Sequence, residues 1–167
     1  LDELDPSYSY FAVMTHDDAP REAMPANTVC YSAGGLAGDT PIPLICSGFK
    51  NIDITKKEVF CSFVGSITHP ISLCPRGYGP TSFRLYEALQ LGSIPIYIYD
   101  TMWLPWQEQI NWNEIAVLVH QSKLSELDLL LSSFSEKRIE TMQNKIADVY
   151  KEFFTFDGTC KKIIESL

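Results

Sequence analysis

Residues 72–100 read SLCPRGYGPTSFRLYEALQLGSIPIYIYD, and the order of elements in this segment indicates the fold class. It opens with a short apolar segment at 72–74 that favours a β-strand and runs into a loop rich in Gly and Pro. Residues 81–91 have helical periodicity, and Gly92 follows in the position where many helices end in glycine. Residues 94–99 form a continuous apolar run, typical of a strand buried on both faces of a parallel sheet. The order strand, loop, helix, strand therefore predicts an α/β fold.

Further apolar runs extend this pattern on both sides. Residues 59–64, VFCSFV, predict another strand buried on both faces, and residues 10–14, YFAVM, predict a buried strand. In the C-terminal third, apolar residues recur at spacings of three and four, which predicts helices that pack on the core. This stripe consists of Ile139, Met142, Ile146, Val149 or Tyr150, and Phe153. We expect a parallel sheet with helices on its faces.

The composition excludes several classes of partner. The chain has 167 residues and a net charge of −8, so it offers too few basic side chains for nucleic acid. No apolar run approaches the roughly eighteen residues of a membrane-spanning helix, so we expect no membrane segment in this chain. The five cysteines include no CxxC pair, and we expect Cys61 and Cys74 to be buried thiols rather than metal ligands.

The loop between the first strand and the helix has the chemistry of a diphosphate site. Its glycines leave backbone N–H groups accessible, and the helix dipole adds partial positive charge where Thr81 and Ser82 stand. Arg76, beside Gly77, and Arg84, one turn into the helix, can each grip phosphate oxygens with two N–H groups. The alternative is that Thr81 and Ser82 are ordinary helix caps.

Glu87 lies three residues beyond Arg84 on the same face of the predicted helix. A carboxylate beside a phosphate site suggests hydrogen bonds from a neighbouring polyol, as acidic residues make with ribose in nucleotide folds. The alternative is an ordinary surface ion pair between Arg84 and Glu87. The chain contains no Asp-x-Asp sequence to hold a divalent ion against phosphates, so we expect no metal site and no required cofactor.

These residues resemble the exostosin-type glycosyltransferases. The run CPRGYGPTSFRLYEALQLGSIPIYIYD at 74–100, followed by Leu104-Pro105 and by INW at 110–112, is similar to that family's pattern in content and order. Upstream, FAVMTHD at 11–17 and GDTPIP at 38–43 resemble further elements of the family. The resemblance covers nearly the whole chain, and residues 74–100 are its most specific part.

The resemblance implies a GT-B fold of two Rossmann-like lobes with a nucleotide sugar between them. Residues 51–167 would be the donor-binding lobe, and residues 1–50 a remnant or the C-terminal part of the acceptor-side lobe. It further implies transfer of a sugar from a nucleotide sugar, commonly a UDP-sugar, to a glycan or glycoprotein acceptor, with inversion and without an essential metal. By matching position, the donor-binding residues would be Gly65, Ser66, Arg76, Gly77, Thr81, Ser82, Arg84 and Glu87, with Glu87 on the ribose.

The resemblance leaves the catalytic base and the chemistry open. His16, Asp17 and Asp18 follow a predicted strand, at the end where open α/β sheets present ligands, and one of them is the candidate base. The alternatives are that they only shape a turn and that the base lies outside this chain. A non-catalytic nucleotide- or glycan-binding module of the same fold is the rival function. The compartment also stays open: the Golgi lumen for a eukaryotic relative, the cytoplasm for a viral or bacterial one.

The connection between residues 59–64 and 72–74 is short. Six residues separate Gly65 from Ser72, whereas parallel strands need a crossover of a dozen or more. Either these strands do not pair directly, or residues of the intact chain are absent here. The family has a helix and further residues at this point, which favours the second alternative. We therefore expect a spatial break between about Ser66 and Ser72, with the flanking strands parallel in one sheet.

Overall fold

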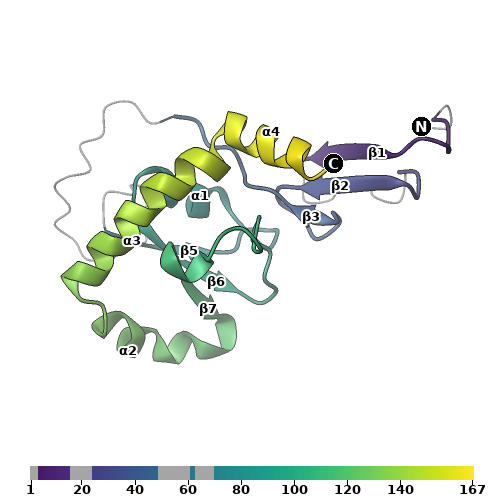
Figure 1. Cartoon of the computed structure of the whole chain (residues 1–167). Coiled ribbons are helices and arrows are strands. Elements are labelled where there is room, and N and C mark those ends of the chain that lie inside the picture. The colour runs from purple at the N-terminus through teal and green to yellow at the C-terminus, as the bar shows by residue number, and fades with distance from the viewer. Residues whose placement is uncertain (1–3, 16–23, 49–60, 63–69) are drawn as a thin grey trace.

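The computed structural model describes residues 4–15, 24–48, 61–62 and 70–167, and these contain two separate parallel sheets (Figure 1). The first sheet has the order β1-β2-β3. Its strands are β1 (Tyr10–Met14), β2 (Thr28–Ser32) and β3 (Thr40–Pro41). The second sheet has the order β4-β5-β6-β7. Its strands are β4 (Cys61–Ser62), β5 (Ile71–Pro75), β6 (Ile94–Tyr99) and β7 (Val117–His120). The expected α/β architecture with parallel strands is confirmed.

Helices follow the strands of the second sheet. They are α1 (Phe83–Gln90), α2 (Leu127–Ser132), α3 (Glu136–Val149) and α4 (Phe156–Glu165), with the 3-10 turns η2 (Trp112–Glu114) and η3 (Gln121–Glu126) and the π-helical turn η4 (Tyr150–Phe154). Gly92, just after α1, has a φ of 62°, and the following Ser93 N–H donates to Ala88 O at 2.9 Å. This is the left-handed glycine that the sequence predicts at the end of the helix. Among the described residues, no helix has the length and apolar character to cross a membrane.

The core lies around β6. Ile94 and Ile96 are fully buried, and Tyr97 is 1% exposed, so the continuous apolar run 94–99 forms a strand covered on both faces over most of its length. The predicted helical stripe packs on this core: Met142, Ile146, Val149 and Phe153 are buried, and Ile139 and Tyr150 are partly buried against it. The stripe continues through η4, where Phe154 contacts the rings of Tyr86 and Trp112.

The first sheet is covered less completely than the sequence predicts. Residues 10–14 form a strand as expected, but the prediction that this strand is buried was wrong. Phe11 and Val13 are 52% and 50% exposed, and Val29, which lies opposite Phe11 in β2, is 42% exposed. An apolar run predicts a strand, but it does not report whether another element covers both faces of that strand.

The strands on either side of the short connection are parallel, as expected. Cys61 pairs with Ile71 and Ser62 with Ser72, which makes β4 a direct parallel neighbour of β5. The rest of the predicted strand at 59–64 lies outside the described residues. The expected spatial break between Ser66 and Ser72 also falls mainly on residues 63–69, which lie outside the described part, so it stays a prediction.

The C-terminal helix returns to the first sheet. After η4 the chain continues into α4, whose end lies beside β1 and β2 (Figure 1). The Tyr31 hydroxyl on β2 and the Ser166 hydroxyl, just after α4, are 2.6 Å apart and share a hydrogen bond. The turn into α4 is tight, because a Cβ at Gly158 would lie 2.3 Å from Glu152 O. This segment therefore connects the helices of the second sheet to the first sheet.

Candidate functional site

The predicted diphosphate loop folds over the carboxyl end of β5. The strand ends at Pro75, and α1 begins at Phe83 after its cap residue Ser82. Gly77 N–H donates to Thr81 O at 3.2 Å, and the Ser82 hydroxyl donates to Pro75 O at 3.1 Å. These two hydrogen bonds close the loop and place its backbone at the N-terminal end of α1, the end of a helix that attracts anions.

Arg76 lies at the start of this loop and is oriented by Asp100. Its guanidinium pairs with the Asp100 carboxylate and also donates to Tyr78 O at 2.8 Å. The pKa of Asp100 lies below its ordinary value, first because Thr101 N–H donates to the carboxylate at 2.6 Å and also because of Arg76. The Arg76 side chain is 38% exposed, so N–H groups not engaged in these bonds can reach a ligand.

Tyr97 holds the other end of the loop. Its hydroxyl donates to Pro80 O at 2.9 Å and accepts from Trp103 N–H at 3.2 Å. Burial raises the pKa of Tyr97 to about 12, so the phenol keeps the proton that it donates to Pro80. The loop is therefore held at both ends by residues at the end of β6, Tyr97 and Asp100. Sequence reasoning assigned neither a role, although an Asp directly after a buried strand was a signal for one.

The hydroxyls of Thr81 and Ser82 lie against different neighbours. Thr81 is 4% exposed, and its buried hydroxyl interacts with that of Tyr86 without reaching hydrogen-bond geometry. Burial raises the pKa of Tyr86, so this hydroxyl stays protonated. The Ser82 hydroxyl is taken by Pro75 O, and it makes no capping bond to α1. Contacts from either hydroxyl to a diphosphate stay a prediction.

Arg84 and Glu87 are both half-buried on α1. The negative charge of Glu87 acts on Cys46, whose thiol contacts Phe83 O at 3.8 Å. Burial first, and Glu87 second, raise the pKa of Cys46 to about 12, so this thiol is not a nucleophile at neutral pH. Glu87 therefore lies on the side of α1 that faces the segment after β3, and its predicted role toward ribose stays a prediction.

A cavity of about 300 Å³ opens where the loop meets the first sheet. Its lining combines three of the predicted donor-binding residues with their neighbours in the loop and with residues that follow β1 and β3: Thr15, Leu44, Gly77, Tyr78, Thr81, Ser82 and Phe83. Thr15 directly precedes the candidate bases His16, Asp17 and Asp18, which lie outside the described residues, as do Gly65 and Ser66. Larger cavities occur elsewhere, but this one is lined by the predicted diphosphate loop.

The described residues hold no group of three or more His, Cys, Asp or Glu side chains that could bind a metal ion. Four of the cysteines lie in the described part of the chain: Cys30, Cys46, Cys74 and Cys160. Cys74 is 1% exposed, which confirms its prediction as a buried thiol, whereas the side chain of Cys61 lies outside the described part.

Comparison with known proteins places the loop and α1 inside a known domain. Residues 70–134 match the Exostosin GT47 domain, and this range contains residues 74–100, the most specific part of the family resemblance. The predicted resemblance to the exostosin-type glycosyltransferases is thus confirmed for residues 70–134.

Curated relatives agree with this assignment. The chain is 41% identical over 76 residues to a probable glucuronosyltransferase of Oryza sativa subsp. japonica and to a probable beta-1,4-xylosyltransferase of Arabidopsis thaliana. Each match covers 46% of this chain and 18% of the relative. The exostosin-1 homolog of Caenorhabditis elegans is 35% identical over 81 residues, 48% of this chain and 21% of its own length. The chain therefore spans about a fifth of the exostosin relatives that it matches.

Proposed function

We propose that this chain contributes the donor-binding lobe of a GT-B glycosyltransferase, which moves a sugar from a UDP-sugar to a hydroxyl of a glycan acceptor. The observation that carries the proposal is the closed loop from Arg76 to Ser82, at the N-terminal end of α1. The loop backbone and the guanidinium of Arg76 offer hydrogen-bond donors and positive charge to an anionic ligand. The chain as a whole has a net charge of −8, so this positive charge is local. The names of the relatives, glucuronosyl- and xylosyltransferase, support sugar transfer as the chemistry.

The proposed reaction is a single displacement with inversion. The acceptor oxygen attacks the anomeric carbon while the bond from that carbon to the diphosphate oxygen breaks, and the acceptor proton passes to a base. Arg76, Arg84 and the N-terminus of α1 stabilise the negative charge on the departing UDP. His16, Asp17 and Asp18 follow Thr15, which lines the cavity beside the loop, and they remain the candidate bases.

We also propose that the reaction needs no metal. The two arginines supply positive charge for the phosphates, and no Asp-x-Asp sequence is present to hold a divalent ion against them. Transfer should therefore continue in EDTA at an unchanged rate. Loss of transfer in EDTA with recovery on addition of manganese would contradict metal independence.

Nucleotide binding tests the loop directly. By calorimetry, Arg76→Ala and Arg84→Ala should each weaken UDP binding by about 1.5–3 kcal/mol, because each removes charge-assisted hydrogen bonds. Uridine should bind all variants alike, because it carries no phosphate. Arg138→Ala is the matched control, since Arg138 lies on α3 against the ring of Phe134. UDP binding by both loop variants at the parent affinity would refute the phosphate assignment.

Transfer itself separates the enzyme from a binding module of the same fold. A panel of nucleotide sugars, screened for thermal stabilisation of the protein, identifies the donor, which is then tested for hydrolysis and for transfer to glycans. UDP-sugar binding without turnover on any acceptor would favour the non-catalytic module. Release of UDP that depends on an acceptor would establish the transferase.

A further inference from the structure

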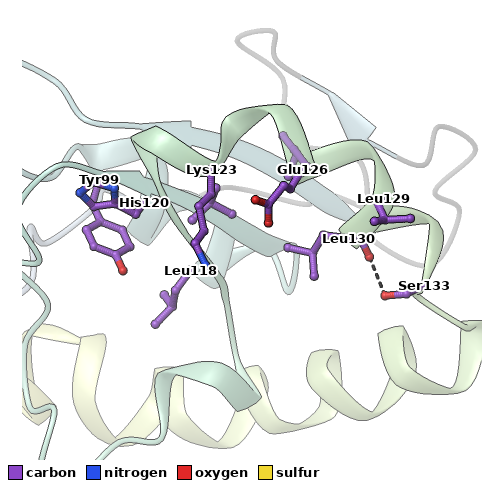
Figure 2. Close-up of a pocket in the computed structure, with 10 residues that line it drawn as sticks. Tyr99, Leu118, His120, Lys123, Glu126, Leu129, Leu130 and Ser133 are labelled. Atoms are coloured by element: carbon purple, nitrogen blue, oxygen red, sulfur yellow. Dashed lines mark hydrogen bonds between the residues drawn. The ribbon is translucent and has the colours of Figure 1, made fainter.

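A second cavity, of about 590 Å³, lies at the carboxyl ends of β6 and β7 (Figure 2). Tyr99 is the last residue of β6 and His120 the last of β7, and both line it. Lys123 and Glu126 of η3 extend into it, and Leu118 and Leu130 form apolar walls. Its volume falls within the usual range for small-molecule sites, roughly 300–1,000 Å³.

This cavity shares an edge of the sheet with the diphosphate loop. Arg76 follows β5, Asp100 follows β6, and His120 ends β7, and these three parallel strands are successive neighbours. Neighbouring strands are about 4.8 Å apart, so the end of β7 lies roughly 10 Å from that of β5. Ligands of open α/β sheets bind outside the carboxyl ends of the strands. A ligand extending from the loop along this edge would reach the second cavity.

The aromatic side of the cavity is held in place by its neighbours. The ring of Tyr99 stacks on Tyr97, with centroids 5.4 Å apart, and meets His120 edge to face at 5.5 Å. His120 Nδ1 lies 2.8 Å from the Ser122 hydroxyl and also accepts from Ser122 N–H. These contacts fix the imidazole and leave Nε2 as the ring nitrogen available to a ligand.

The polar groups of the cavity suit hydroxyl groups better than ions. Lys123 donates hydrogen bonds and Glu126 accepts them, and their opposite charges disfavour both a phosphate and a metal cation. A sugar ring matches this lining, because its C–H faces pack on apolar and aromatic side chains while its hydroxyls both donate and accept. We propose that this cavity binds a neutral sugar unit of the acceptor glycan, at a distance from the unit that carries the reacting hydroxyl. This inference rests on the proposed function.

Acceptor length is the test, with β-1,4-xylo-oligosaccharides of two and six units as probes. The variant Lys123→Met/Glu126→Gln changes two exposed side chains of η3, and Glu140→Gln/Lys151→Met makes the same replacements at exposed positions outside the cavity. We expect the first variant to raise the KM for the hexamer about fivefold or more, since Lys123→Met removes a hydrogen-bond donor and Glu126→Gln removes the charge that strengthens the bond accepted there. The KM values for the dimer and for the UDP-sugar should not change. Equal hexamer KM values in the variant and the control would overturn the proposal.

Direct binding keeps this test independent of turnover. Calorimetry or NMR titration of the full chain with xylohexaose should show weaker binding to the cavity variant than to the control. Xylohexaose that binds both variants equally, or does not bind the parent chain, would overturn the cavity assignment. Absence of transfer by a parent chain that still binds xylohexaose in a Lys123- and Glu126-dependent way would refute the transferase and leave the cavity standing.

Discussion

The two sheets differ in how completely they are covered. In the second sheet, Ile94 and Ile96 of β6 are fully buried, whereas Phe11 and Val13 of β1 in the first sheet are about half exposed. The two sheets share one core, in which Tyr31 and Ala33 are buried together with Ile94 and Ile96. The second sheet also carries the predicted diphosphate loop and most of the family match. The first sheet contributes Thr15 to the loop cavity and is tied to α4 through Tyr31. The strand that is covered on both faces and the predicted diphosphate loop thus both belong to the second sheet.

The largest expected effect tests this difference in covering. Ile96→Ala should destabilise the protein by about 2–5 kcal/mol, because it opens a cavity in a closely packed core. Val13→Ala, an aliphatic truncation at a half-exposed position of the first sheet, should cost less than about 1 kcal/mol. Urea unfolding measures both free energies. Equal losses would mean that the two sheets contribute equally to stability.

The turn into α4 tests the connection between the sheets. Gly158→Ala should destabilise the protein by about 1–3 kcal/mol, because the new Cβ would lie 2.3 Å from Glu152 O, a backbone atom that cannot move alone. Gly48→Ala is the matched control, since nothing lies within 4 Å of a Cβ built there. Thermal unfolding of the two variants gives the comparison. Identical transitions would show that the turn relaxes without cost.

A matched pair of tyrosines separates the loop from the rest of the fold. Tyr97→Phe and Tyr31→Phe each remove a hydroxyl that makes hydrogen bonds, and each should cost about 0.5–1.5 kcal/mol of stability. Only Tyr97→Phe releases Pro80 and should also weaken UDP binding, because the loop loses its contact with β6. Calorimetry with UDP measures the affinity of each variant. A weaker UDP affinity in both variants would mean that the first sheet also holds the loop.

The smallest expected effect is the dependence of stability on pH through Asp100. Its pKa is lowered from 3.8 in the folded protein, so its stabilising contribution is present above the unfolded pKa and is lost as the pH falls through the folded value. Asp100→Asn should therefore melt below the parent at neutral pH, and the two melting temperatures should converge as the pH falls below about 4. A difference between the two melting temperatures that persists at pH 3 would contradict this role of the carboxylate.

The sequence predicts the second sheet well because its signals are local. The apolar run 94–99 coincides with β6, and Gly92 ends α1 where the left-handed conformation requires glycine. β2 was missed because Thr28–Ser32, TVCYS, mixes polar with apolar residues and so forms no continuous apolar run. The covering of β1 was also predicted wrongly, since burial of a face depends on elements distant in sequence.

The candidate site was predictable only in its composition. Arg76 and the loop glycines predict anion binding, because the residue types alone indicate that chemistry. The part played by Tyr97 depends on strand register, which pairs it with Cys74 and brings its hydroxyl to Pro80. Register and tertiary contacts of this kind are not encoded in any single segment. The cavity at β6 and β7 depends in the same way on the path of η3.

The return of α4 restricts how the two sheets can move. The chain leaves the first sheet after β3, where Cys46 contacts Phe83 of α1, and comes back through α4 to Tyr31. Tyr31 and Ile42 are also buried in the same core as Ile96, so the first sheet is fixed to the second by packing as well as by these two contacts. The cavity between Thr15 and the predicted diphosphate loop therefore lies within one packed unit, and its shape depends on the anchoring of α4 as well as on the loop.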